Sequence, residues 1–494
     1  MIINGFQNPI CGRILEKAFL LFPVRYCLYI CQPEEYIPSF TAVEREFHHI
    51  DLKRDEDHVD WDALRPLDGD LIEKMRECEA VFLTMMTRYE KRQIISYQER
   101  KRRYLRQLRY WNHVLEERSI GLFLANNIPH EGCDYIIYAL CKLKNIPTLF
   151  FYQDPIKDRL LLLKDWEDPI PGLRKRVEKL KREHALSERP VELSSTFEKH
   201  YTLQTQMAKG QGTVPWYMHR PMPPSVRRWH DVVLPMLLRD LPNFMRHAGF
   251  FLTRPFTQNF WSRIMYNWRK SDRERTMFNF YDAHTVIPDL SRQYLYVPLH
   301  MQPECSTCPM AGAFNDQLLI VQMLSTLLPP GILLYVKEHP VQRDVAKGRD
   351  IAFYKDLVAV SQVRLVPQNY NTFHLLAHCI AVATATGEAG FEALFREKPV
   401  FMFGHRFYQY APGVFPIHTV EECKEALHAI LERGMKPLLP DVRIFLKALE
   451  EVCITGCIDT TYQKMTVLSE EENVHSVSCA LTERLQRILP SPVP

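Results

Sequence analysis

A four-residue motif in the second half of the chain has residue types suited to binding phosphate. Lys337-Glu-His-Pro340 directly follows an apolar run of strand length, which places it at the carboxyl end of an expected strand. Open parallel sheets bind ligands at that edge. A lysine and a histidine there can each donate a hydrogen bond to a phosphate oxygen, while Pro340 stiffens the turn. Taken alone, the motif fits a solvated turn with a single histidine better than a phosphate site.

A second motif, Thr384-Ala-Thr-Gly-Glu-Ala-Gly-Phe-Glu-Ala-Leu394, indicates a strand that runs through a turn of small residues into a helix. Gly387 and Gly390 would let a ligand approach the backbone, and a helix N-terminus would offer N–H groups to a phosphate. We expect Glu392 in the first helical turn, where its carboxylate can accept hydrogen bonds from a ribose diol. The alternative is a tight turn and an acid favoured by the helix dipole. The dinucleotide fingerprint GxGxxG is absent here, which argues against a nicotinamide enzyme.

Alternating strands and helices surround both motifs and predict an α/β domain over residues 291–435. Short apolar runs bounded by polar turns predict the strands, and longer amphipathic segments predict the helices. The strands are expected at 293–298, 332–337, 363–367, 380–384 and 399–403, and the helices at 317–328, 370–378 and 390–397.

The first 165 residues show the same alternation of predicted strands and helices, so we expect a second α/β domain there. Strands are predicted at 26–31, 79–84, 120–125 and 147–152, and helices at 88–117 and 134–144. Residues 166–290 are rich in proline and lack clean strands, which indicates an insertion or linker. Residues 436–494 are expected to form a helical tail.

Residues 216–270 combine basic and aromatic side chains. Nine lysines and arginines stand there against two aspartates, with Trp, Phe and Tyr between them. This composition suits the surface of an anionic membrane, where a lipid-linked acceptor would be found. The alternative is a segment that packs between domains and extends its arginines to solvent.

The composition sets limits on the class of protein. A chain of 494 residues with 46% hydrophobic residues is long enough for two cores. A net charge of +3 gives no general attraction to nucleic acid. The 13 scattered cysteines indicate reduced thiols, and Cys305 with Cys308 has no second pair at zinc-site spacing. We see no secretory signal and no run of about 20 apolar residues, so we expect a cytoplasmic protein without a bound metal.

Four segments of the second domain resemble one known family. They are Tyr296–Glu304, Lys337–Pro340, Thr386–Leu394 and Lys398–Gly404. They are similar to the bacterial capsule polysaccharide biosynthesis and export family, and more widely to GT-B glycosyltransferases with an HP motif, such as sialyltransferases and Kdo transferases. The resemblance implies a GT-B fold: two Rossmann-like domains that face a central cleft, here with a helical insertion and a helical C-terminal tail.

The resemblance also implies roles for residues on the donor side. His339 would hold the donor phosphate, Glu392 the ribose, and the turn from Thr386 to Gly390, which includes Gly387 and Glu388, the phosphate chain. The donor would be a nucleotide sugar linked to CMP, UDP or GDP, and protein cations would replace a metal, so no cofactor is expected. Three residues that follow the first strand would contact the sugar or its phosphate, or form a hydrogen-bonded loop: His300, Gln302 and Glu304.

The first domain must then supply the acceptor site. His130, Glu131 and Asp134 follow the predicted strand at 120–125, so each is a candidate general base toward an acceptor hydroxyl. Asp134 is equally well placed to cap the helix that follows.

These features favour a glycosyltransferase that builds a surface polysaccharide or glycolipid. Two alternatives are kept. One is a UDP-sugar 2-epimerase or a polyol-phosphate transferase, because fold alone does not separate these reactions. The other is a non-catalytic assembly or export factor, although both His339 and Glu392 are present.

Overall fold

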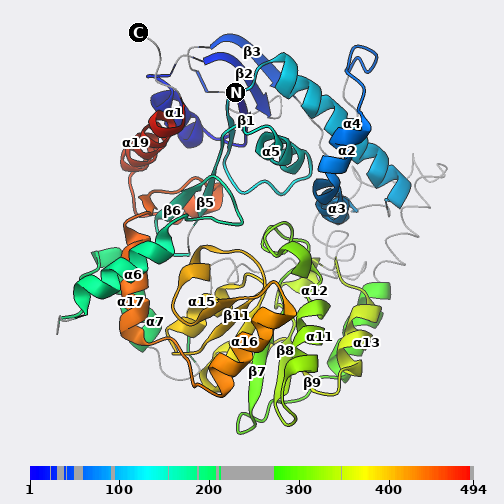
Figure 1. Cartoon of the computed structure of the whole chain (residues 1–494), viewed down its shortest axis with the longest axis vertical. Helices are drawn as coiled ribbons and strands as arrows, with labels where there is room; N and C mark the ends of the chain where they lie inside the picture. Colours follow the sequence, from blue (N-terminus) through cyan, green and yellow to red (C-terminus); the bar gives the residue numbers. More distant parts are fainter. Residues whose placement is uncertain are drawn as a thin grey trace, which may run out of the picture.

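The computed structural model describes residues 1–22, 24–30, 38–39, 42–48, 59–90, 95–153, 155–185, 189–206, 211–212, 272–345 and 348–489. The basic and aromatic stretch 216–270 lies outside these residues. The chain forms two α/β domains, which Figure 1 shows one above the other.

The C-terminal domain is built on a six-stranded sheet that is parallel throughout. The spatial order is β12-β11-β10-β7-β8-β9. Counted along the chain from β7, this is the doubly wound order 3-2-1-4-5-6, whose direction reverses between β7 and β10. The carboxyl ends of these two strands are therefore the expected binding edge. The strands are β7 (Tyr294–Pro298), β8 (Leu333–Lys337), β9 (Val363–Val366), β10 (Ala381–Thr384), β11 (Val400–Met402) and β12 (Val414–Pro416).

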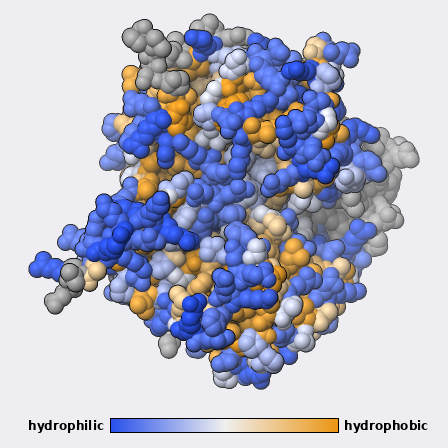
Figure 2. Space-filling view, viewed as in Figure 1, coloured by the Kyte–Doolittle hydropathy of each residue, from blue (hydrophilic) through white to orange (hydrophobic). Residues whose placement is uncertain are grey.

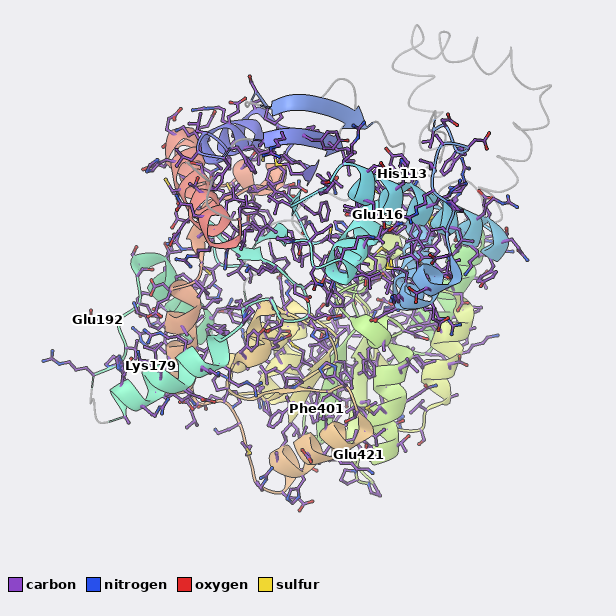
Figure 3. The ribbon with its side chains drawn as sticks, turned by 45° about the horizontal axis from the view of Figure 1, so that its top comes forward. His113, Glu116, Lys179, Glu192, Phe401 and Glu421 are labelled. Carbon is purple, nitrogen blue, oxygen red and sulfur yellow. The ribbon has the colours of Figure 1, made fainter. Side chains whose placement is uncertain are left out.

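Alternating side chains of these strands enter two separate cores, one on each face of the sheet. Tyr294 and Tyr296 of β7 pack on one face, whereas Leu295 and Val297 pack on the other. Because both faces are covered by helices, the strands are almost entirely apolar. Figure 3 shows Phe401 of β11 inside this domain. The helices are α11 (Leu318–Leu327), α12 (Gln342–Val345), α13 (Ile351–Ala359), α14 (Thr372–His378), α15 (Glu388–Leu394), α16 (Val420–Leu431), η3 (Gly312–Asn315), η4 (Phe407–Tyr410) and a helix over residues 272–283.

The N-terminal domain has a seven-stranded sheet with the order β13-β6-β5-β4-β1-β2-β3. The strands β1 to β5 are parallel; at one edge β6 runs antiparallel to β5, and β13 runs antiparallel to β6. This sheet reverses its direction between β1 and β4. The strands are β1 (Ile2–Asn4), β2 (Val24–Ile30), β3 (Ala42–His48), β4 (Phe123–Ala125), β5 (Thr148–Gln153), β6 (Arg159–Leu163) and β13 (Ile454–Thr455).

One predicted strand of this domain was wrong. Residues 79–84 lie in helix α3 (Arg76–Met85). The buried side chains of α3 are Cys78, Phe82 and Met85, spaced by four and three residues, which is the period of a helix face. The other helices before residue 210 are α1 (Pro9–Ala18), α2 (Gly69–Lys74), η1 (Met86–Tyr89), α4 (Tyr97–Glu117), α5 (Cys133–Leu143), α6 (Leu173–His184) and α7 (Ser195–Gln206).

The end of the chain returns to the N-terminal domain instead of forming a separate tail. It contains α17 (Leu439–Glu450), β13, α18 (Thr460–Gln463) and α19 (Glu470–Ile488). The helices α19 and α1 lie side by side in Figure 1, and Arg13 pairs with Glu470 and Glu471 across them. Val477 and Leu481 of α19 are fully buried in the same core as β1 and β2. The last segment therefore completes the first domain.

The helix α6 packs on α17 and turns charged residues outward. Figure 2 shows a hydrophilic surface there, and Figure 3 shows Lys179 on this helix. Leu173, Val177 and Leu180 form its buried side. Within the described parts of the chain, no helix has both the length and the apolar character needed to cross a membrane.

The carboxyl ends of the two sheets face each other at the domain junction. Nη2 of Arg88 donates to the carbonyl of Cys308 at 2.5 Å, and the Sγ of Cys308 lies 3.8 Å from the carbonyl oxygen of Val81. The amide of Gln409 donates to the carbonyl of Glu167 at 3.0 Å. Two Rossmann-like domains that meet at their binding edges are the GT-B architecture, so the predicted fold class is confirmed.

Candidate functional site

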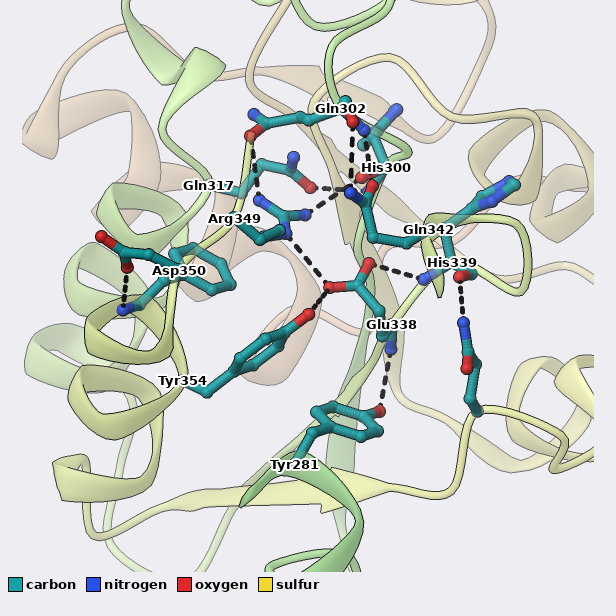
Figure 4. A network of polar contacts seen from close by, with 12 residues as sticks. Tyr281, His300, Gln302, Gln317, Glu338, His339, Gln342, Arg349, Asp350 and Tyr354 are labelled. Atoms are coloured by element: carbon teal, nitrogen blue, oxygen red, sulfur yellow. Dashed lines mark hydrogen bonds and ion pairs between the residues drawn. The ribbon is translucent and has the colours of Figure 1, made fainter. Parts of the chain in front are cut away.

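A buried ion pair holds the two loops that carry the first motif and the end of β7 (Figure 4). Nε of Arg349 donates to Oε2 of Glu338 at 3.1 Å, and their side chains are 1% and 0% exposed. Nη2 of Arg349 also donates to the carbonyl of His300 at 3.0 Å. The hydroxyl of Tyr354 donates to Glu338 at 2.6 Å. Because one arginine bonds to both loops, it fixes their separation.

This network orients His339. Oε1 of Glu338 accepts the backbone N–H of His339 at 2.7 Å, and Nδ1 of the His339 ring accepts the N–H of Val341 at 3.2 Å. Burial lowers the pKa of His339, so the ring is neutral at pH 7. With Nδ1 as acceptor, the proton lies on Nε2, which has no partner in the described part of the chain. His339 thus offers one N–H donor at the carboxyl edge of the sheet.

The structure places Lys337 inside the domain. Lys337 is 3% exposed, and its Nζ donates to the hydroxyl of Thr372 at 3.2 Å. Burial lowers the pKa of Lys337 to about 8. The ammonium of Lys337 therefore has a protein partner at the start of α14, and its expected bond to a donor phosphate stays a prediction.

His300 connects the end of β7 with the turn after β10. Its Nε2 lies 2.9 Å from the hydroxyl of Thr384 and accepts the N–H of Thr386 at 3.3 Å. The N–H of Gly387 donates to the hydroxyl of Thr384 at 3.0 Å. Burial lowers the pKa of His300 to about 3, so the ring is neutral. These bonds rigidify the point where the strand order reverses, and they occupy two N–H groups expected to face a phosphate.

The two glycines of this turn make room for protein atoms. A Cβ on Gly387 would lie 2.8 Å from the Thr384 hydroxyl, and one on Gly390 would lie 2.5 Å from the Tyr408 hydroxyl. Tyr408 also donates a hydrogen bond to the carbonyl of Gly387. The glycines therefore permit close packing of helix on sheet, which differs from the expected approach of a ligand to the backbone.

The helix α15 begins at Glu388, two residues earlier than predicted. Gly387 is its N-cap, so Glu388 is the acid of the first turn and Glu392 lies one turn later. The placement of Glu392 in the first turn was therefore wrong. Both acids share one side of the helix because they are four residues apart. Burial, followed by the charge of Glu388, raises the pKa of Glu392 to about 8, so at pH 7 it is protonated and can both donate to and accept from a diol.

The remaining donor-side candidates are part of the loop framework. The backbone N–H of Gln302 donates to Gln342 at 2.7 Å, and its amide donates to the carbonyl of Asn315 at 2.5 Å. The carbonyl of Pro340 accepts from Gln368 at 3.0 Å. Glu304 is exposed, and its carboxylate accepts from Ser306 at 2.5 Å. Glu304 is thus free to reach a ligand, whereas Gln302 and Pro340 hold the loops.

A cation that the sequence did not reveal lies at the same edge. Arg406 follows β11, is 9% exposed, and places its guanidinium 5.4 Å from the ring centre of Tyr152 in the N-terminal domain. Nη2 is 3.6 Å from Oε1 of Glu388, and Nε is buried without a hydrogen-bond partner among the described residues. Its position directly after a predicted strand was the available signal.

Comparisons with known proteins agree with this geometry. Residues 239–422 match the family model described as capsule polysaccharide biosynthesis protein. This match covers less than half of the chain and includes most of the C-terminal α/β domain. A search of curated proteins gave no match.

Solved structures show only weak likeness to this chain. One is a beta Kdo 2,7 transferase, KpsC, of Thermosulfurimonas dismutans, with a TM-score of 0.30 and 12% identity over 78% of this chain and 91% of that one. Another is a UDP-GlcNAc 2-epimerase of Methanocaldococcus jannaschii, with a TM-score of 0.27 and 9% identity over 91% of this chain and 98% of that one. A third is a glycosyltransferase of Rickettsia africae, with a TM-score of 0.24 and 10% identity over 85% of this chain and 97% of that one. Likeness at these scores carries no weight for the function.

On the N-terminal side of the molecule, Asp134 stabilises a loop. Its residue is 3% exposed, and its two carboxylate oxygens accept the N–H groups of His130 at 3.0 Å and Glu131 at 2.7 Å. Both oxygens are therefore engaged at the start of α5. Gly132 is the N-cap of α5 and no side chain caps this helix, so Asp134 holds the preceding loop and is not the cap that the sequence offered as an alternative.

His130 and Glu131 differ in their suitability as a base. Burial of the His130 ring opposes its charge, but its contact with Cys305 and the charge of Asp134 outweigh this and raise its pKa to about 9. His130 is thus protonated at pH 7 and cannot accept a proton there. Glu131 is exposed. Of the three candidates, it alone has a carboxylate that no described residue occupies.

The cysteines form no disulfide among those described, and all twelve are free. In the same parts of the chain, no three His, Cys, Asp or Glu residues lie together as metal ligands would. His130 and Cys305 contact each other across the domain junction.

Proposed function

We propose that this chain is a glycosyltransferase that moves a sugar from a nucleotide-sugar donor to a growing capsular polysaccharide or glycolipid. The observation that carries the proposal is the position of His339, Glu388 and Glu392 around the carboxyl ends of β7, β8 and β10 in a doubly wound domain. The match of residues 239–422 to a family model described as capsule polysaccharide biosynthesis protein supports it. A nucleotide would bind at this edge of the sheet.

The proposed reaction displaces the nucleotide from the anomeric carbon. An acceptor hydroxyl held by the N-terminal domain attacks that carbon, and the bond from the carbon to the phosphate oxygen breaks. Nε2–H of His339 donates to the leaving phosphate, where negative charge grows. The proton of the hydroxyl passes to a carboxylate, for which Glu131 is the N-terminal candidate. Glu392, protonated at pH 7, bonds the ribose diol.

The proposal includes metal independence, because protein donors surround the phosphate position. The activity with the preferred donor should then survive EDTA and should not increase when Mg²⁺ or Mn²⁺ is added. A loss of activity in EDTA that Mg²⁺ restores would refute this part while leaving the sugar transfer intact.

The membrane contact is a further part of the proposal. A lipid-linked acceptor would bring the enzyme to the cytoplasmic face of the inner membrane, with residues 216–270 as the contact. Flotation of the full chain with vesicles of phosphatidylglycerol, compared with phosphatidylcholine, tests this. Flotation with neither vesicle would contradict it.

The central test is thermal stability in the presence of CMP, CDP, UDP and GDP. A nucleotide that binds the folded state stabilises it by mass action, by about 2.7 kcal/mol at one hundred times its Kd. We expect one nucleotide to raise the Tm of the wild type, and to raise it less in His339→Ala and Glu392→Ala. Turnover of the matching nucleotide sugar only when a glycan acceptor is present would support transfer over epimerisation. The proposal fails if no nucleotide shifts the Tm of the wild type.

A further inference from the structure

Arg406 is a buried cation with unused hydrogen-bonding capacity. The residue is 9% exposed, and its Nε lies buried without an acceptor in the described structure. Its closest acid, Glu388, is 3.6 Å away, which is beyond hydrogen-bond distance. An unpaired buried donor is costly, about 1–3 kcal/mol, and each one in a native protein calls for a reason.

The other cations at this edge already have protein partners. Lys337 is bonded to Thr372 beneath the surface, and Arg349 is bonded to Glu338 and to the loop after β7. His339 is neutral at pH 7 because burial lowers its pKa. A nucleotide phosphate, which is negatively charged at pH 7, therefore meets one neutral N–H donor at His339. Arg406 can supply positive charge, because it is a cation whose Nε has no acceptor among the described residues.

Arg406 lies close enough to supply it. The His300 ring is within electrostatic reach of both the His339 ring and the Arg406 guanidinium, and Glu304 is within reach of both His339 and Arg406. The planar guanidinium donates through Nε and an Nη in a fork that fits two oxygens of one oxyanion. The free Nε makes such a fork available.

We propose that Arg406 binds an oxyanion of the donor, the phosphate that links nucleotide and sugar, and that its contact with Tyr152 couples this binding to the domain junction. The assignment rests on the proposed function and names a residue that the motifs do not include. Tyr152 belongs to β5 of the N-terminal domain. An anion bound at Arg406 thus lies where the two sheets meet.

In this proposal the oxyanion displaces the carboxylate of Glu388 from its position beside Arg406. Its carboxylate now lies nearest to Arg406, at 3.6 Å, and its side chain is 31% exposed. Burial raises the pKa of Glu388, and the charge of Glu304 adds to this rise, although the charge of Arg406 opposes it. A phosphate that carries two or more oxygens toward the guanidinium can form the direct hydrogen bonds that Glu388 does not make.

The test compares ligands that differ in their oxyanion. Calorimetric titration would use the nucleotide that best stabilises the wild type, its uncharged nucleoside, and glucuronate as a free carboxylate. Arg406→Lys keeps the positive charge but loses the two-donor fork of the guanidinium, whereas Arg406→Met loses both the fork and the charge. We expect nucleotide affinity to fall about tenfold and about a hundredfold, respectively, with a tenfold change corresponding to 1.4 kcal/mol. Nucleoside affinity should stay within twofold.

Arg443 provides the matched control. Its guanidinium lies 5.0 Å from the ring centre of Tyr201 and its side chain is 13% exposed, but it is bonded to Glu198 and to the carbonyl of Val191. Arg443→Lys should leave nucleotide affinity unchanged. Equal nucleotide affinity in wild type and Arg406→Met, with weaker binding in His339→Ala, would overturn the role of Arg406 and spare the proposed function. Glucuronate binding that alone depends on Arg406 would assign the residue to a sugar carboxylate and overturn the phosphate assignment. No nucleotide binding to any variant or to the wild type would end both proposals.

Discussion

Replacing Arg349 by methionine tests whether the buried ion pair holds the donor loops. The arginine and its partner Glu338 are 1% and 0% exposed. The substitution removes the ion pair and the bonds to Gln302 at 3.2 Å and to the carbonyl of His300 at 3.0 Å. Glu338 then remains buried with its charge, stabilised by the hydroxyl of Tyr354. Loss of one partner of such a pair costs about 3–5 kcal/mol.

That free energy should appear in thermal unfolding. For a domain of this size, 1 kcal/mol corresponds to about 2–4 °C, so Arg349→Met should lower the Tm by about 6–20 °C. The double variant Glu338→Gln, Arg349→Met should be less destabilised than the sum of the two single variants, because the buried charge is gone. The control is Arg487→Met, which breaks the pair with Glu483, where the side chains are 65% and 64% exposed. Such a pair contributes at most about 1 kcal/mol. A Tm shift in Arg349→Met no larger than in Arg487→Met would refute the reasoning.

Three further predictions concern other parts of the molecule. The folded-state pKa of Glu392 is about 8, above its unfolded value, so the wild type loses stability as pH rises from about 5 to 8. Over that range the free energy of unfolding of Glu392→Gln should rise relative to wild type by up to about 1.4 kcal/mol per pH unit. Parallel curves of Tm against pH for the two proteins would contradict this. Gly5→Ala should cost about 2 kcal/mol or more, since its φ is +83° and a Cβ would lie 2.2 Å from Asn126, whereas Gly121→Ala, with open space, should be neutral in urea unfolding. A chain ending at Leu468 should lose the cooperative unfolding of the N-terminal domain, because α19 buries four aliphatic side chains worth about 1.5–3 kcal/mol each; a soluble product with wild-type Tm would disprove this.

The second domain was predictable because each of its strands is a short apolar run between polar turns. Five of its six strands fall within a residue or two of the predicted positions. The sixth, β12, contains only Val414 to Pro416, all half-buried, so it lacks that pattern. The segment 79–84 shows the opposite error, because a short apolar run does not distinguish a strand from a helix face. The tail could not be placed, since β13 has two residues and pairs with β6 about 295 positions earlier in the chain.

The candidate site was predictable only where chain order sets position. Residues directly after a strand must lie at its carboxyl end, which is why His300, His339 and Glu388 were found. Arg349 was not found, because its role depends on the fold that returns it from a loop to Glu338, 11 residues earlier. Arg406 does follow a strand, but its importance comes from Tyr152 in the other domain.

The internal bonds of the two motifs change what the motifs mean. The hydroxyl of Thr384, the N–H of Gly387 and the ring of His300 bond to one another, and both glycines leave room for neighbouring side chains. Their residue types are thus required by the geometry of the strand reversal, whatever ligand binds there. Motif resemblance therefore reports the framework, and the identity of the ligand depends on the few groups that the framework leaves unbonded. Among the described residues those groups include Nε2 of His339, Nε of Arg406 and the carboxylates of Glu388 and Glu392, and substitutions there separate the loss of ligand binding from the loss of the fold.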